Sequence, residues 1–194
     1  MKLYQIIEKL GRPEKPVISF VGAGGKTSCI LELADEWAAR GKSVLITTTV
    51  HMEEPKILGR TGWIDQPAEN IRKALETPGV VIAGSGSETP QKIRGLSEEV
   101  YIQAASKAQA VLVEADGSRK FPVKVPGKNE PVIREDTTHI LILAGASALG
   151  RPLDQVCHRL EYAKKILGPQ NRILTAETLA KLLEKGYVEP LKKQ

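Results

Sequence analysis

A glycine-rich stretch of the chain reads Val21-Gly22-Ala23-Gly24-Gly25-Lys26-Thr27. It follows residues 17–21, a continuous apolar run with β-branched side chains that is typical of a buried strand. It precedes a segment reaching to about residue 40, in which apolar side chains recur at the spacing of one helical face. Glycines between a strand and a helix let backbone N–H groups turn toward an anion, which the helix N-terminus also attracts. We therefore predict a phosphate-binding loop rather than a turn that only connects two elements.

The polar residues of this loop indicate which ligand it would hold. Lys26 can reach the β- and γ-phosphates of a nucleotide, and the Thr27 hydroxyl can complete a Mg²⁺ shell. The full GxxxxGK[ST] pattern has glycine where this chain has Phe20, so the loop is a shortened GxxGKT form, similar to that of ATP-dependent ligases of the cell-wall and folate type. We predict ATP with Mg²⁺ as the bound species, with GTP as the alternative. The predicted nucleotide-binding residues are Gly22, Ala23, Gly24, Gly25, Lys26, Thr27 and Ser28.

A dinucleotide-binding turn is the competing interpretation of the same glycines. Gly22 and Gly24 give G-x-G, but Thr27 occupies the position of the third glycine. The next predicted strand ends in threonines, whereas a ribose-binding strand would end in an acidic residue. Both departures count against a dinucleotide site.

The rest of the chain alternates short apolar runs with helical patterns. Such alternation predicts an α/β fold with three layers, in which helices flank a mostly parallel sheet as in P-loop NTPases. We expect one nucleotide-binding domain over residues 1–194, with a C-terminal helical portion from about 151 to 194. Residues 51–66 have no clear pattern. The other expected strands are 43–48, 80–83, 110–114 and 140–144, and the expected helices include 3–10, 67–75, 98–107 and 175–185, the last ended by Gly186.

Composition narrows the class of protein. The chain has 194 residues, of which 41% are hydrophobic and 26% charged, values that suit an ordinary folded domain. No apolar run approaches the ~20 residues of a membrane span, and the N-terminus has no secretory signal pattern. Two cysteines without CxxC spacing fit a reducing cytoplasm. A net charge of +5 with few aromatic residues favours an anionic small molecule over nucleic acid.

A second chemical signal is the apolar run 111–113 followed by Glu114-Ala115-Asp116. Acidic residues at the end of a buried strand serve P-loop enzymes as Mg²⁺ ligands and orient the attacking group. A solvated strand end is the alternative interpretation. We predict Lys26, Glu114 and Asp116 as the catalytic residues. The predicted metal ligands are Thr27, Thr49, Glu114 and Asp116.

Residues 118–131 combine prolines with basic side chains and follow the acid-bearing strand. We expect this segment to close over the nucleotide or over an anionic second substrate, because ligands of open parallel sheets lie at this edge. A solvated basic loop and structural histidines are the alternatives. The candidates for the second substrate are Arg119, Lys120, Lys124, His51 and His158.

Taken in order, the motifs resemble those of the YqeC family over about residues 17–160. They are VGAGGKTS, TTTVHM, VEADGSRKFPVKVP, NEPVI, ALG and CHR. The resemblance implies a P-loop nucleotide-binding protein that serves as an accessory factor of selenium-dependent molybdenum hydroxylases. Where family members tend to read HEP, this chain has Asn129-Glu130-Pro131, which counts against a histidine acting there.

The function expected from these observations is an NTP-binding, NTP-hydrolysing accessory protein in maturation of such a hydroxylase. Its expected partners are a nucleotide and the molybdenum hydroxylase or its cofactor, without nucleic acid or membrane. Two alternatives stay open: an ATP-dependent small-molecule kinase or ligase, and a non-catalytic docking module gated by nucleotide. Oligomeric state, second substrate and the choice between ATP and GTP do not follow from the sequence.

Overall fold

The computed structural model describes residues 2–11 and 14–193. The chain divides into two compact units. The first unit contains residues 1–20, 27–115 and 133–141, and the second contains residues 21–26, 116–132 and 142–194. No helix in the described part of the chain is both long and apolar enough to cross a membrane.

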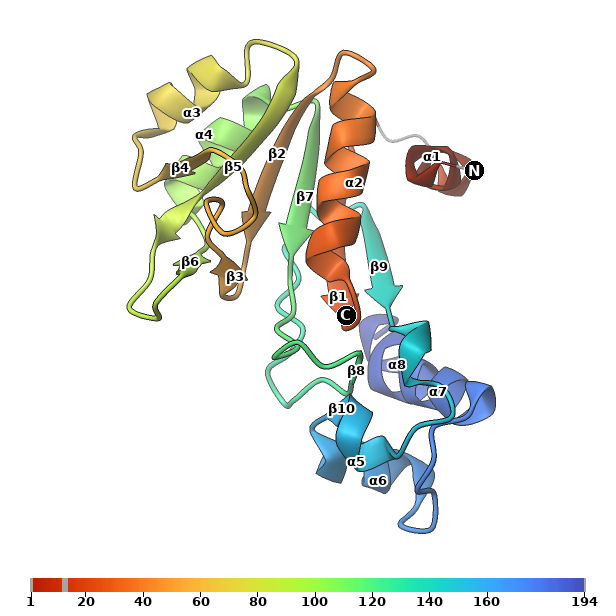
Figure 1. Ribbon diagram of the computed structural model, residues 1–194. Coiled ribbons are helices and arrows are strands. Elements are labelled where there is room, and N and C mark those ends of the chain that lie inside the picture. Colours follow the sequence, from red (N-terminus) through yellow and green to blue (C-terminus); the bar gives the residue numbers. More distant parts are fainter. Residues whose placement is uncertain (1, 12–13, 194) are drawn as a thin grey trace. The chain divides into compact units, whose positions relative to one another are not determined.

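One large sheet dominates the first unit (Figure 1). Its strands follow the order β3-β6-β5-β2-β7-β1-β9, and β4 pairs with β5 beside this path. β7 pairs in parallel with β1 and β2, and β5 pairs in parallel with β2 and β4, whereas β6 is antiparallel to β5 and β3. The bounds are β1 Val17–Gly22, β2 Ser43–Thr48, β3 Met52–Glu53, β4 Gly62–Ile64, β5 Gly79–Gly86, β6 Lys92–Arg94, β7 Ala110–Glu114 and β9 His139–Leu143.

The central strands are buried along their whole length, which explains their continuous apolar runs. Helices supply the cover: α2 lies in front of the sheet in Figure 1, and α4 lies behind it. α4 begins after Ser97, whose hydroxyl accepts the Val100 N–H, so the predicted N-cap is confirmed. The bounds are α1 Leu3–Leu10, α2 Lys26–Ala38, α3 Ala68–Ala74 and α4 Glu98–Lys107.

The predicted α/β class with a mostly parallel sheet and flanking helices is therefore confirmed. The antiparallel strands β3 and β6 were not predicted, because they are only two and three residues long. Strands this short leave no alternation of apolar and polar side chains to detect.

Short helices surround a separate two-stranded sheet in the second unit. β8 (Val123–Lys124) and β10 (Cys157–His158) run parallel, with His158 opposite Lys124. The apolar core beneath them includes Val123, Val156 and Leu182. The helices are α5 Leu153–Val156, α6 Leu160–Leu167, α7 Ala176–Leu183 and α8 Glu189–Leu191, with a 3-10 turn at Ala146–Ala148.

The expected end of the last helix at Gly186 is wrong. α7 continues into a π-helical turn, Glu184–Val188, and then into α8. A Cβ at Gly186 would lie 3.3 Å from Pro126 Cδ and 3.5 Å from Val125 Cγ1. This glycine therefore permits close packing inside a helical segment instead of forming its C-cap.

Candidate functional site

The glycine-rich loop belongs to the second unit up to Lys26. Ala23 donates its N–H to Leu143 O at 2.9 Å, which fixes the start of the turn. A Cβ on Gly24 would lie 2.2 Å from Gly145 N, so no other residue fits there. Gly25 has a φ of +107°, which side-chain-bearing residues rarely adopt, and open space surrounds its Cα. The loop thus presents an accessible backbone surface at Gly24 and Gly25, both of which are exposed.

Lys26 is the first residue of α2 and is only 4% exposed. Its Nζ donates to Gly22 O at 2.8 Å, across the turn that the glycines make. The ammonium group is therefore held against the backbone of its own loop. A cation in this position adds positive charge to a backbone turn that already offers N–H donors to an anion.

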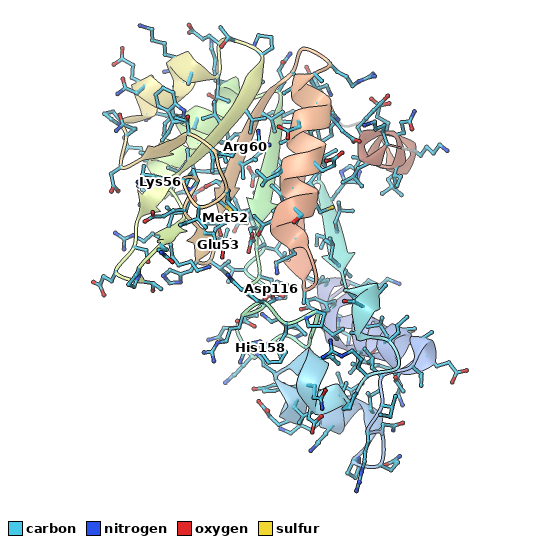
Figure 2. The ribbon with its side chains drawn as sticks, in the orientation of Figure 1. Met52, Glu53, Lys56, Arg60, Asp116 and His158 are labelled. Carbon is cyan, nitrogen blue, oxygen red and sulfur yellow. The ribbon has the colours of Figure 1, made fainter. Side chains whose placement is uncertain are left out.

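Asp116 is completely buried in the same unit (Figure 2) and accepts three hydrogen bonds. Gly22 N–H and the Tyr187 hydroxyl donate to Oδ2 at 3.1 and 2.7 Å, and Lys124 Nζ donates to Oδ1. Both carboxylate oxygens are thereby engaged by protein donors. Asp116 connects the first glycine of the loop to a buried lysine and to the C-terminal helical segment.

Lys124, a candidate for contact with a second substrate, is completely buried instead. Its ammonium pairs with Asp116 and, at 2.7 Å, with Glu130. Glu130 also accepts Arg159 Nη2 at 2.8 Å and Gly127 N–H at 3.1 Å. Burial alone would raise the pKa of Glu130, but these donors and cations lower it below its usual value.

These contacts form what we call the Asp116 network: Asp116, Lys124, Glu130, Arg159 and Tyr187. Sequence reasoning identified Asp116 and Lys124 as functional but gave no role to the other members. Glu130 and Arg159 lie within the NEPVI and CHR motifs, so the resemblance carried a signal for them. Tyr187 had no such signal, because one aromatic residue in a C-terminal helical pattern reads as ordinary core.

The other predicted metal residues meet in the first unit. Thr27 Oγ1 donates to Glu114 Oε2 at 2.9 Å, and the carboxylate belongs to a largely buried residue. The Glu114 carbonyl accepts the Thr48 hydroxyl at 2.7 Å and the Thr49 N–H at 3.1 Å. This arrangement follows from the register, because Thr48 lies opposite Glu114 where β2 and β7 end together.

A hydroxyl hydrogen-bonded to a carboxylate is a donor set that suits Mg²⁺. This cation takes oxygen ligands, and it commonly uses one or two protein groups together with water and substrate phosphates. In the described part of the chain, no three His, Cys, Asp or Glu residues are grouped to hold a metal ion by themselves. Thr27 and Glu114 therefore fit a metal that arrives with a nucleotide better than a permanently bound one.

The remaining second-substrate candidates have different environments. Arg119 and Lys120 are exposed and both have positive φ, 48° and 64°. His158 packs against Phe121 with 5.9 Å between ring centroids, and its Nδ1 is buried with no hydrogen-bond partner among the described residues. Burial lowers the pKa of His158, and the nearby cations of Lys124, Arg159 and Arg119 lower it further. His51 is exposed in the first unit.

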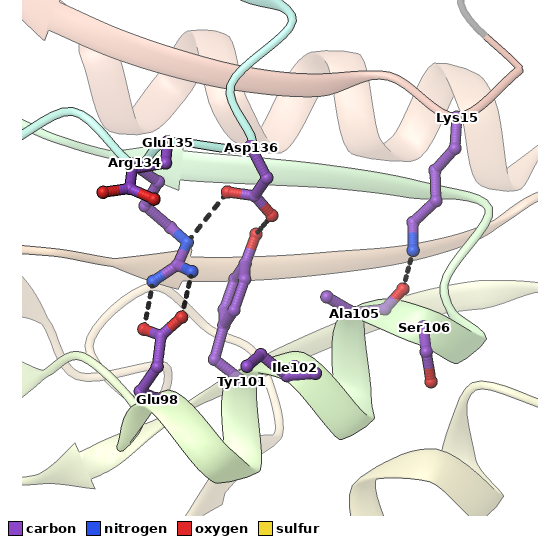
Figure 3. Close-up of a pocket in the computed structure, with 9 residues that line it drawn as sticks. All are labelled: Lys15, Glu98, Tyr101, Ile102, Ala105, Ser106, Arg134, Glu135 and Asp136. Carbon is purple, nitrogen blue, oxygen red and sulfur yellow. Dashed lines mark hydrogen bonds and ion pairs between the residues drawn. The ribbon is translucent and has the colours of Figure 1, made fainter.

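A pocket in the first unit contains none of these predicted residues (Figure 3). Arg134 donates to both Glu98 carboxylate oxygens at 2.9 Å and to Asp136 at 3.1 Å, and it stacks 3.4 Å above the Tyr101 ring centroid. The Tyr101 hydroxyl donates to Asp136 at 2.6 Å. Since the charged groups along this pocket pair with one another, it ties α4 to residues 133–141 and does not present a site for a ligand.

Together, the fold and the geometry define an α/β protein with a glycine-rich Lys-Thr loop after a central strand and an acid at the end of the neighbouring strand. The YqeC protein family model matches residues 18–161, and the chain belongs to this family. This confirms the resemblance inferred from the motifs.

A curated relative supports the same assignment. "Uncharacterized protein YqeC" of Escherichia coli (strain K12) is 34% identical over 167 residues, which cover 84% of this chain and 65% of the relative. The chain thus spans slightly less than two thirds of that protein's length. No solved structure matches the chain significantly.

Proposed function

We propose that this protein binds a nucleoside triphosphate with Mg²⁺ at its glycine-rich loop and hydrolyses it. The observation that carries the proposal is the Lys26 ammonium, buried and held 2.8 Å from Gly22 O beside the exposed backbone of Gly24 and Gly25. A buried cation next to free backbone surface at a helix N-terminus suits the phosphate chain of a nucleotide. The order of loop, strand and acid is that of P-loop NTPases.

Each residue then has a defined task. The backbone around Gly24 and Gly25 would bind phosphate oxygens, and Lys26 would balance their charge. Thr27 and Glu114 would provide oxygen ligands to Mg²⁺, directly or through water. When bound, Mg²⁺ neutralises charge on the phosphates during transfer. The Glu114 carboxylate is also the acid best suited to orient an attacking water.

We place this activity in the maturation of a selenium-dependent molybdenum hydroxylase. Family membership supports this assignment, because the resemblance associates the YqeC family with that process. The partner would be the hydroxylase itself or its cofactor, in the cytoplasm. Nucleotide turnover would then drive a step of assembly rather than make a metabolite.

A second candidate function is an ATP-dependent small-molecule kinase or ligase. The shortened GxxGKT form of the loop favours it, since ligases that act on small acids share this form. In that case the exposed Arg119 and Lys120 would contact the second substrate. The two candidates differ in what accepts the γ-phosphoryl group: water, or a second molecule.

Product analysis with the purified protein tests both. Incubation with Mg-ATP or Mg-GTP alone should give the nucleoside diphosphate and inorganic phosphate, and Lys26→Ala should abolish binding and turnover while the fold is retained. The exposed Lys56 offers a matched control, and Lys56→Ala should behave as the wild type. Diphosphate formed only when a second small molecule is added would favour the kinase or ligase. Unchanged nucleotide affinity and turnover in Lys26→Ala would refute the loop assignment.

A further inference from the structure

Tyr187 is a tyrosine of the C-terminal π-helical turn and has no exposed surface. Its hydroxyl donates to Asp116 Oδ2 at 2.7 Å, across 71 positions of sequence. The same oxygen accepts Gly22 N–H at 3.1 Å. Two consecutive hydrogen bonds therefore link the C-terminal segment to the first glycine of the phosphate loop.

The surroundings of this link hold it in one arrangement. Lys124 occupies the other oxygen of Asp116, and Glu130 and Arg159 complete the Asp116 network with two acids and two cations. Burial raises the pKa of Tyr187 far above its usual value, and the adjacent Asp116 carboxylate raises it further, so the hydroxyl keeps its proton and acts as a donor. A buried network with its charges paired resists rearrangement, because each lost contact leaves a desolvated group.

The π-helical turn explains how a C-terminal residue reaches Asp116. Gly186 lies against Val125 and Pro126, which directly follow Lys124 in the chain. A π-turn inserts one residue into the helical repeat and so redirects the side chains that follow, and such turns are frequent at functional sites. Here the redirected side chain is Tyr187.

We infer that Tyr187 is a positioning residue of the phosphate loop: by holding Asp116, it fixes the direction of the Gly22 N–H and the path of the loop around Lys26. The inference that this sets nucleotide affinity rests on the function proposed above. The C-terminal segment is then part of the nucleotide site's machinery, and whatever displaces it from Asp116 weakens nucleotide binding.

Tyr187→Phe tests the inference, because it keeps the ring and removes only the hydroxyl. Tyr101→Phe is the matched control: Tyr101 is also buried and also donates to a carboxylate, that of Asp136, but it lies on α4 in the first unit. Both variants should lower the urea midpoint of unfolding to a similar extent. In Tyr187→Phe alone, the Kd for Mg-ATP from isothermal titration should rise about tenfold, the effect of losing a hydrogen bond to a charged group.

Hydrogen–deuterium exchange of peptides covering residues 21–26 gives a readout that needs no nucleotide. Without ligand, the Gly22 amide should exchange about tenfold faster in Tyr187→Phe and at the wild-type rate in Tyr101→Phe. Equal loop exchange in the two variants would overturn the inference. If the wild type failed to bind Mg-ATP or Mg-GTP, the proposed function would fall, while faster loop exchange in Tyr187→Phe would still uphold the positioning role.

Discussion

Asp116→Asn removes the negative charge at the centre of the Asp116 network. The carboxylate accepts from Lys124, Gly22 N–H and Tyr187, whereas an amide has one acceptor oxygen and an NH₂ group that would face a donor. Breaking a buried ion pair by removing one partner costs about 3–5 kcal/mol. Since Lys124 keeps Glu130 at 2.7 Å, we expect the lower end, about 3 kcal/mol.

Urea unfolding followed by far-UV circular dichroism measures this cost. With a slope of about 2 kcal/mol per M, a loss of about 3 kcal/mol lowers the midpoint by roughly 1.5 M. Asp154→Asn is the matched control, because Asp154 is exposed and its loss should change the free energy of unfolding by less than about 0.5 kcal/mol. A midpoint for Asp116→Asn equal to that of Asp154→Asn would refute the reasoning.

The double variant Asp116→Asn with Lys124→Met shows whether the lysine is the cause. If the cost arises from a buried ammonium that has lost a partner, replacing that ammonium by an apolar side chain of similar length should recover part of the stability. We expect the double variant to be more stable than Asp116→Asn alone. Additive losses would instead assign the cost to the contacts with Gly22 and Tyr187.

Two further predictions concern the metal and the basic segment. Glu114→Gln should weaken binding of Mg-ATP relative to metal-free ATP, because a neutral amide is a poorer ligand for a hard cation, and titrations with and without Mg²⁺ would show this; wild-type Mg²⁺ dependence would remove Glu114 from the metal site. Trypsin should cleave after the exposed Arg119 and Lys120 but not after the buried Lys124, and saturating Mg-nucleotide should slow cleavage at the first two. Equal rates with and without nucleotide would leave residues 118–120 as ordinary surface.

The sequence predicted the parts of the fold that depend on local pattern. Buried strands such as 43–48 and 110–114 are continuous apolar runs, and Ser97 is followed by two acids in the first turn of a helix. The hydrogen bond between Thr27 and Glu114 was also within reach, since it joins two motif residues at strand ends that a parallel sheet brings together. Pattern fails for β3 and β6, which are too short to show one.

The partners of Asp116 were beyond sequence reasoning for a different reason. An acid at the end of a buried strand has the same local pattern whether it binds a metal or a lysine. What decides between them is the path of residues 117–131 and of the C-terminal helices, which bring Lys124 and Tyr187 to it. Burial of Lys124 likewise depends on the pairing of β8 with β10, two residues each, and not on the basic composition of the segment.

The contacts of the two acids assign them different tasks. For Asp116 to bind Mg²⁺ directly, Lys124 would have to give up a buried ion pair, and Gly22 and Tyr187 would lose their acceptor. Glu114 Oε2 instead accepts a neutral hydroxyl, that of Thr27, and both oxygens are suitable ligands for the same cation. Replacing one hydroxyl contact by Mg²⁺ leaves no buried charge without a partner, whereas displacing Lys124 does. The cost of rearrangement therefore favours Glu114 at the metal and Asp116 as the anchor of the phosphate loop.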